Sequence, residues 1–160
     1  MKIALAKYTC DHCGSAFEAP MLDESSYGEF LLWSSTGKVA YMNAFEDSAY
    51  LEVKGRLSET FDDLRTNPFK VAEVLQNIFG PMACDPDPTG APYVIGAQPP
   101  CPSCKDGHVA SWELIYPPKV VEYDIPIVTH VRWDRLSDSE KAEQIAHFVR
   151  TTVTRAITPN

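Results

Sequence analysis

Two pairs of cysteines in this chain have the spacing of metal ligands. Cys10 and Cys13 form one C-x-x-C pair, and Cys101 and Cys104 form the other. Two intervening residues let a tight turn aim both sulfurs at one ion, and four thiolates at about 2.3 Å complete a tetrahedral zinc site. Such a site has no open position for water. We therefore expect a structural zinc ion that contributes to folding rather than to catalysis.

Three other interpretations of the cysteines remain open. Iron binds to the same set of thiolates, although we rank it below zinc. The two pairs could instead be independent redox sites, but no βαβ pattern surrounds either of them. His12 lies inside the first pair and His108 follows the second, so either could replace a cysteine as ligand.

The residues around both pairs resemble the knuckles of a zinc ribbon. The segment 8–18 (YTCDHCGSAFE) is similar to a first knuckle, and Cys101-Pro102-Ser103-Cys104 is similar to a second, which often has a proline after its first cysteine. The resemblance implies a metal site and no particular activity. The chain departs from the ribbon pattern in two ways. Lys105 stands where glycine is usual, and 87 residues separate Cys13 from Cys101.

The remaining residues do not form a known catalytic motif. The sequence lacks a glycine-rich phosphate loop, G-x-S-x-G and H-E-x-x-H. Residues 100–104 match the P-C-x-x-C half of the zinc-deaminase signature, but no histidine is followed two positions later by glutamate. The fifth cysteine, Cys84, is expected to be a small packed residue; a nucleophile there would need a histidine such as His130 nearby. We expect no catalytic residue, and an enzyme using Cys84 or a histidine is the third hypothesis.

The negative charge of the chain is concentrated in one third of its length. The formal net charge is −8, and the stretch 11–63 contains eleven acidic and three basic residues, so the rest of the chain is neutral. Such a surface repels phosphate backbones and attracts basic proteins. A solvated, solubilising face is the simpler interpretation. A nucleic-acid-associated zinc ribbon in transcription or RNA handling is the second hypothesis, and four arginines could supply its basic area (Arg132, Arg135, Arg150 and Arg155).

The first hypothesis is a non-catalytic, zinc-stabilised protein-binding domain with a basic protein as its partner. Aromatic residues inside an acidic rim suit a protein interface, and the acidic stretch contains eight of them. In size and charge alone, the chain resembles bacterial immunity proteins, which neutralise basic toxins such as nucleases. The oligomeric state is left open. The acidic residues expected to contact the partner are Glu29, Glu46, Asp47, Asp62 and Asp63.

The pattern of apolar and turn-forming residues predicts an α+β fold. Strands are expected at 2–8, 28–33, 38–42 and 109–116, with the second and third forming a hairpin. A helix is predicted from Asn67-Pro68 to a stop at Gly80-Pro81, and segment 48–64 is ambiguous. Residues 84–100 are expected to be mostly loop, and 124–133 extended. Ser137 and Glu140 form a capping box before a last helix whose apolar stripe is expected to be Ala142, Ile145, Ala146, Val149, Val153 and Ala156.

These elements predict one domain over residues 1–160, in which the zinc site joins the two ends of a small antiparallel sheet. The first knuckle is expected at 8–18, an inserted hairpin and helix subdomain at 19–98, the second knuckle and a strand at 99–118, and the C-terminal helix at 137–157. No apolar run approaches the roughly 20 residues that cross a bilayer, and Ile3–Ala6 is shorter than the apolar region of a secretory signal. We therefore expect a cytoplasmic protein, in which thiols stay reduced.

Overall fold

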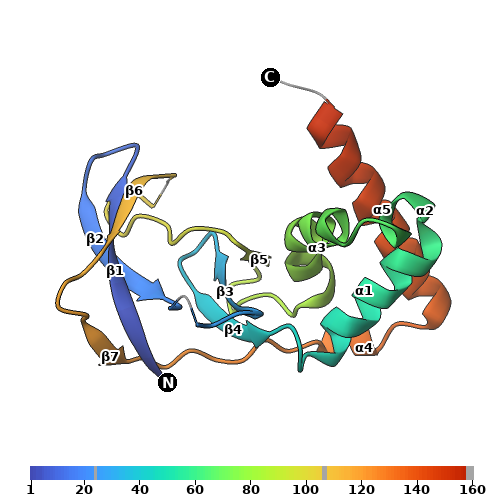
Figure 1. The fold of residues 1–160 in the computed structure, drawn as a ribbon, viewed down its shortest axis with the longest axis horizontal. Helices are drawn as coiled ribbons and strands as arrows, with labels where there is room; N and C mark the ends of the chain where they lie inside the picture. The colour runs from blue at the N-terminus through green and yellow to red at the C-terminus, as the bar shows by residue number, and fades with distance from the viewer. Residues whose placement is uncertain (24, 106–107, 158–160) are drawn as a thin grey trace.

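The computed structural model describes residues 1–23, 25–105 and 108–157, without the side chains of residues 63 and 152–157. The fold is α+β and has three layers: an outer sheet, a middle sheet and a group of helices (Figure 1). The strands are β1 (Lys2–Cys10), β2 (Ala16–Met21), β3 (Glu29–Ser34), β4 (Val39–Asn43), β5 (Tyr93–Ile95), β6 (Val109–Leu114) and β7 (Val120–Glu122). The helices are α1 (Ser48–Thr60), α2 (Asp62–Arg65), α3 (Pro68–Ala83), α4 (Val131–Asp134) and α5 (Asp138–Ile157).

The outer sheet is built around β1, its longest strand. One edge of β1 pairs with β2, and the other edge pairs with β6 near Cys10 and with β7 near Lys2, all antiparallel. The sheet therefore joins the two ends of the segment 19–98, which is expected to be an insertion. It also places the first cysteine pair, at the end of β1, beside the start of β6.

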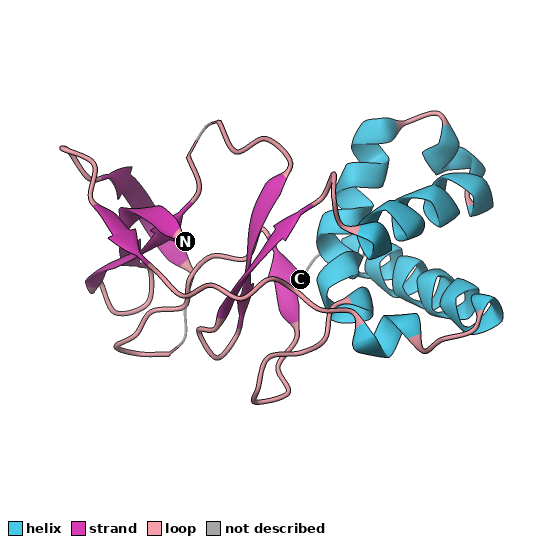
Figure 2. Ribbon diagram, turned by 90° about the horizontal axis from the view of Figure 1, so that it is seen from below, coloured by secondary structure: helices cyan, strands magenta, loops and turns pink. Residues whose placement is uncertain are grey.

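The middle sheet is buried on both faces, which explains why its strands are almost continuously apolar. Its order is β4-β3-β5, antiparallel throughout, and the expected hairpin is β3 and β4. Side chains alternate between two cores: Leu32 and Met42 pack toward the helices, whereas Trp33 and Val39 pack toward the outer sheet. Figure 2 shows this sheet between the outer strands and the helices.

The helices pack together on the far side of the middle sheet. Asp47 caps α1 by accepting a hydrogen bond from Tyr50 N, and Asn67 caps α3 in the same way from Lys70 N. The expected capping box of α5 is present, because Ser137 N donates to Glu140 Oε2 at 2.8 Å. At the centre, the fully buried Trp133 donates from Nε1 to Glu52 Oε2 at 2.9 Å, which links α4 to α1.

Three predictions about these elements are wrong. Helix α3 does not stop at Gly80-Pro81 but continues to Ala83, with Pro81 inside the helix. The 124–133 segment, expected to be extended, ends in the helical turn α4, which positions Trp133. Residues 84–100 are mostly loop, as expected, with the short strand β5 among them. Ala142 is exposed, whereas Ile145 and Val149 form the buried stripe of α5. Side-chain packing at Val153 and Ala156 lies outside the described residues.

None of the helices in the described part of the chain is both long and apolar enough to span a bilayer.

Candidate metal centre

The first cysteine pair lies in the tight turn that joins β1 to β2. Cys10 is the last residue of β1, and the backbone reverses through hydrogen bonds from Gly14 N to Cys10 O (3.0 Å) and from Cys10 N to Ser15 O (2.9 Å). Gly14 takes a φ of 69°, a left-handed conformation that costs glycine little. The turn thus exposes Cys13 while Cys10 stays buried.

The second pair forms a turn of the same kind just before β6. Lys105 N donates to Cys101 O at 2.9 Å, which matches the bond from Gly14 to Cys10. Lys105 also takes a positive φ, 63°, although it is not glycine. The departure from the ribbon pattern at this position is therefore one of residue type and not of backbone shape. The two turns are tied together, because Asp11 N donates to His108 O at 2.8 Å and Cys10 pairs with Val109.

The four sulfurs converge on one point. All four ligand atoms lie within 4.8 Å of one another, and the sulfurs of Cys10 and Cys104 are 3.6 Å apart while those of Cys13 and Cys101 are 3.7 Å apart. A tetrahedral ion with metal–sulfur bonds of about 2.3 Å separates its ligands by about 3.8 Å. Disulfides would need sulfurs at about 2.05 Å, so the cluster has the geometry of a metal site.

Hydrogen bonds within each turn favour the thiolate form of the ligands. The side chain and backbone of Ser15 hydrogen-bond to Cys13 and lower its pKa to about 6. Backbone N–H groups, first that of Cys104 and also that of Ser103, lower the pKa of Cys101 against the opposing effect of desolvation. Because a metal binds the thiolate, these contacts prepare the residues for it. The donor set fits zinc: four sulfurs, tetrahedral spacing and N–H donors around them.

The histidines beside the cysteine pairs are not part of this cluster. Both His12 and His108 are exposed, and neither belongs to the set of ligand atoms that converge. Four sulfurs already complete the tetrahedron, so a histidine ligand is not required.

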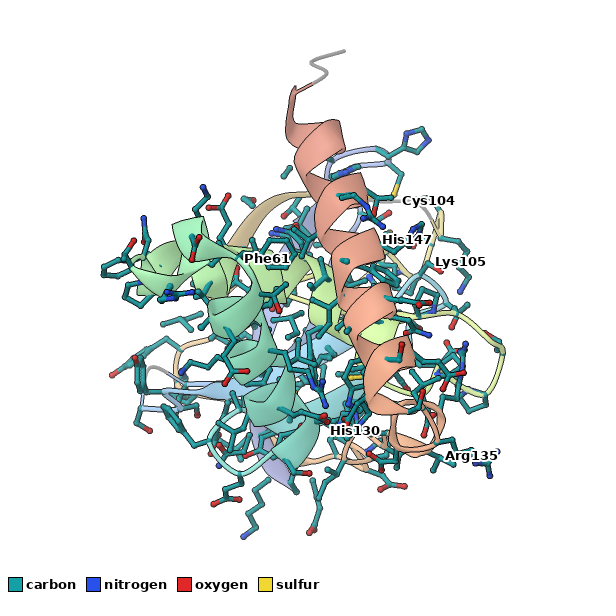
Figure 3. The ribbon with its side chains drawn as sticks, turned by 90° about the vertical axis from the view of Figure 1, so that its right-hand side faces the viewer. Phe61, Cys104, Lys105, His130, Arg135 and His147 are labelled. Atoms are coloured by element: carbon teal, nitrogen blue, oxygen red, sulfur yellow. The ribbon has the colours of Figure 1, made fainter. Side chains whose placement is uncertain are left out.

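The fifth cysteine lies elsewhere, against a histidine and an aspartate. Cys84 is buried next to His130, whose Nε2 lies 2.8 Å from Asp47 Oδ2 and whose Nδ1 lies 2.9 Å from Ala83 O. Figure 3, which looks onto the helices, shows His130 well apart from Cys104. The structure therefore brings together the trio of cysteine, histidine and acid that a thiol nucleophile requires.

The chemistry of this trio differs from that of an activated thiol. Both ring nitrogens of His130 face acceptors, so both must bear protons. Burial opposes the charge, but the hydrogen bonds to Asp47, Cys84 and Ala83 outweigh it and raise the pKa of His130 to about 10. Burial also raises the pKa of the Cys84 thiol. An imidazolium cannot act as a base, and a nucleophilic cysteine needs a lowered pKa and access. The geometry supports a packing role for Cys84.

The acidic residues singled out from the sequence do not form one surface. The prediction that Asp47 contacts a partner is wrong. Its side chain is 10% exposed and is engaged by His130 and by the N-terminus of α1. Asp62 pairs with Arg65 on α2, which lies among the helices and away from β3 (Figure 1). The Asp63 side chain lies outside the described residues.

Glu29 and Glu46 do lie close together, beside two exposed aromatic rings. Glu29 pairs with Asn43 across the hairpin and Glu46 N donates to Asn43 O, and both carboxylates raise the pKa of Tyr41 after the larger effect of its burial. Tyr27 is 86% exposed and Phe45 is 59% exposed, with ring centroids 5.7 Å apart. We call Tyr27, Glu29, Phe45 and Glu46 the aromatic–acidic patch. The sequence indicated aromatic residues in an acidic stretch, but it did not indicate which of them are exposed.

Comparison of this chain with protein-family models, curated proteins and solved structures finds no match.

Proposed function

We propose that this chain is a zinc-stabilised protein-binding domain without catalytic function. The convergence of four sulfurs on one point supports the metal part of this proposal. The ion would be held by Cys10, Cys13, Cys101 and Cys104. It would stabilise the junction between the β1–β2 turn and the start of β6, which are far apart in sequence.

The metal part is tested by elemental analysis of protein purified without added metal. We expect about one zinc ion per chain and no visible thiolate-to-iron absorption. Cys13→Ser and Cys104→Ser should each lower the zinc content under chelator competition. Cys84→Ser is the matched control, because Cys84 is a cysteine outside the cluster, and it should retain the zinc. A chain that lacks metal, or that loses it only in the Cys84 variant, contradicts the proposal.

The aromatic–acidic patch supports the protein-binding part. Exposed aromatic side chains provide most of the binding energy at many protein interfaces, and carboxylates around them favour a basic partner. Phe45 is held in place, since its ring packs on Gly28, where an added Cβ would lie 2.2 Å from Phe45 Cε2. An acidic domain of this size could act as an inhibitor or immunity protein against a basic toxin, and this remains the specific form of the proposal.

This part is tested by affinity capture with the tagged, metal-loaded chain. We expect a basic protein to be retained, and the combined variant Tyr27→Ser, Phe45→Ser, Glu29→Lys, Glu46→Lys to lose it by at least about tenfold. The control is Phe69→Ser with Glu73→Lys, which alters an exposed aromatic and an exposed acid on α3. Retention of DNA or RNA at low salt, weakened by neither variant, would favour the nucleic-acid hypothesis instead.

The described arginines give that second hypothesis little support. Arg132 and Arg150 line a groove on α3, α4 and α5, but Glu140 and Glu143 line the same groove. A mixed surface of this kind lacks the single sign that phosphate binding requires.

A further inference from the structure

Strand β6 has an open edge in the outer sheet. Among the described residues it pairs only with β1, and five of its six residues, Ala110–Leu114, are exposed. Gln98 covers the start of this edge, because Gln98 Oε1 accepts a hydrogen bond from Val109 N at 3.1 Å. Beyond that point the backbone donors and acceptors of the edge are available to another extended chain.

Few of the usual protections of an edge strand are present in Ala110–Leu114. Natural edges use proline, charged side chains or a bulge to prevent pairing; here the register shift affects only Ala110, next to the covered start, and Glu113 is the one charged residue. The exposed residues include Trp112 and Leu114, which occupy the same face because they are two positions apart. Both line a cavity of about 390 Å³ whose other walls include Leu5, Leu22 and Tyr116.

We propose that this edge binds the β6 strand of a second copy of the chain, antiparallel and about a two-fold axis at Trp112. The strand is complementary to itself in that register. Trp112 lies opposite Trp112 of the second copy, and Ala110 lies opposite Leu114, so that apolar residues share one face. On the other face, Ser111 lies opposite Glu113. Aromatic and apolar cross-strand pairs stabilise a sheet, and the two-fold symmetry satisfies both edges at once.

The charges favour this register and this partner. A two-fold axis at Glu113 would place two carboxylates directly opposite each other, whereas the axis at Trp112 places a hydroxyl opposite each carboxylate. Glu113 is also neutralised within its own chain by Lys7, at 2.9 Å. Glu113 is the only charged residue of β6 and is paired with Lys7, so the strand itself adds little charge repulsion between two copies.

The contact is small, so the dimer is expected to be weak. Stable interfaces bury about 800 Å² per partner, and a five-residue edge with two large side chains provides less. We therefore expect a dissociation constant on the order of 10–100 µM. The inference is independent of the proposed function, because the aromatic–acidic patch contains no residue of β6.

Sedimentation equilibrium of the metal-loaded full chain tests the dimer. Between about 5 µM and about 1 mM, the mean mass should rise from the monomer value of 17.8 kDa toward twice that value. Trp112→Lys and Leu114→Lys should each keep the monomer mass. Phe69→Lys is the control, because it adds the same charge at a residue of α3 that is 87% exposed, and it should associate like the unchanged chain. Circular dichroism verifies the fold of each variant, and Trp112→Ser replaces any lysine variant that does not fold.

The register has its own test. Ser111→Lys places a lysine opposite Glu113 of the second copy and should tighten the dimer about three- to tenfold, whereas Ser111→Asp should weaken it by a similar factor. A mass that stays at 17.8 kDa over the whole concentration range overturns the proposal. A dimer that persists in both Trp112→Lys and Leu114→Lys overturns it as well. A dimer that Ser111→Lys weakens overturns the two-fold axis at Trp112.

Discussion

At the scale of single residues, the two cysteine turns adopt one backbone shape with two different residues. Gly14 and Lys105 both follow a C-x-x-C pair, both have a positive φ, and both donate to the carbonyl of the first cysteine. Glycine takes this conformation freely, but a residue with a Cβ loses about 1 kcal/mol or more in it. The second turn therefore has avoidable strain.

Exchanging these residues should change the free energy of unfolding in opposite directions. Lys105→Gly is expected to stabilise the metal-loaded chain by roughly 0.5–1 kcal/mol, and Gly14→Ala to destabilise it by about 1 kcal/mol. Nothing lies within 4 Å of the Cβ position at Gly14, so the alanine variant reports strain and not a clash. Urea unfolding at fixed zinc concentration measures both values, and equal signs for the two variants would exclude the strain argument.

The His130–Asp47 pair predicts how stability depends on pH. The pKa of His130 is raised from 6.5 to about 10, so its stabilisation is complete below pH 6.5 and is lost as the pH rises toward 10. The pKa of Asp47 is lowered: burial raises it, but the bonds from His130 and Tyr50 N outweigh burial, so its contribution is lost only in acid. Cys84 and Asp85 also face the imidazolium.

We expect the free energy of unfolding to fall by roughly 2–4 kcal/mol between pH 6.5 and pH 10, since a buried ion pair is broken. His130→Gln should be less stable than the unchanged chain at pH 6 and should show a much smaller decrease toward pH 10. Urea unfolding across this range measures the effect. Parallel curves for the two proteins would mean that another group causes the alkaline decrease.

At the scale of elements, helix α3 and strand β5 approach so closely that only glycine fits between them. A Cβ on Gly80 would lie 2.2 Å from the carbonyl oxygen of Tyr93, and backbone atoms cannot move aside as a flexible side chain can. Gly80 is therefore a packing residue inside α3 and not the residue that ends the helix. The glycine serves the packing of β5 against the helix, and the strand in turn extends the middle sheet.

Gly80→Ala should therefore destabilise the chain by roughly 2–4 kcal/mol, through displacement of β5. Gly55→Ala is the matched control, because Gly55 is also in a helix, α1, and a Cβ there meets nothing within 4 Å. That variant should stabilise the chain by about 0.5–1 kcal/mol, the difference in helix propensity. Thermal unfolding of both variants measures the contrast, and a neutral Gly80→Ala would contradict the close packing of β5.

At the scale of the whole molecule, two apolar cores are expected to respond differently to loss of a metal bound at the cysteine cluster. The core between the outer and middle sheets includes Tyr8 and Val109, next to the cysteine turns, whereas the helical core is built from residues such as Leu57, Phe79 and Trp133. Among the described residues, the strands that bear or adjoin the four cysteines border only the first core. Its binding energy should therefore stabilise the outer sheet more than the helices.

A strong chelator is expected to remove amide-exchange protection from β1, β2 and β6 while α1 and α3 keep theirs. The helical circular dichroism signal should fall by less than about a fifth. Hydrogen exchange followed by mass spectrometry distinguishes the segments, and the Cys84→Ser variant, with the cluster intact, should respond as the unchanged chain does. Simultaneous loss of protection in all elements would show a single cooperative unit instead.

The sequence by itself determined the features that local chemistry specifies. The spacing within Cys10/Cys13 and within Cys101/Cys104 indicated metal ligands, because a C-x-x-C turn aims two sulfurs in one direction whatever surrounds it. That the two pairs meet at one point depends on the pairing of β1 with β6. The hairpin of β3 and β4 and the caps of α3 and α5 follow from turn and cap residues in the same way.

Only the tertiary structure decided which side chains meet and which remain exposed. Asp47 and Glu46 are neighbours in sequence, yet Asp47 is bound by His130 from a segment 83 residues away while Glu46 stays exposed. Likewise, the open edge of β6 and the close approach at Gly80 arise from strand order and packing. Local patterns contain no information about such contacts, because burial depends on elements that are distant along the chain.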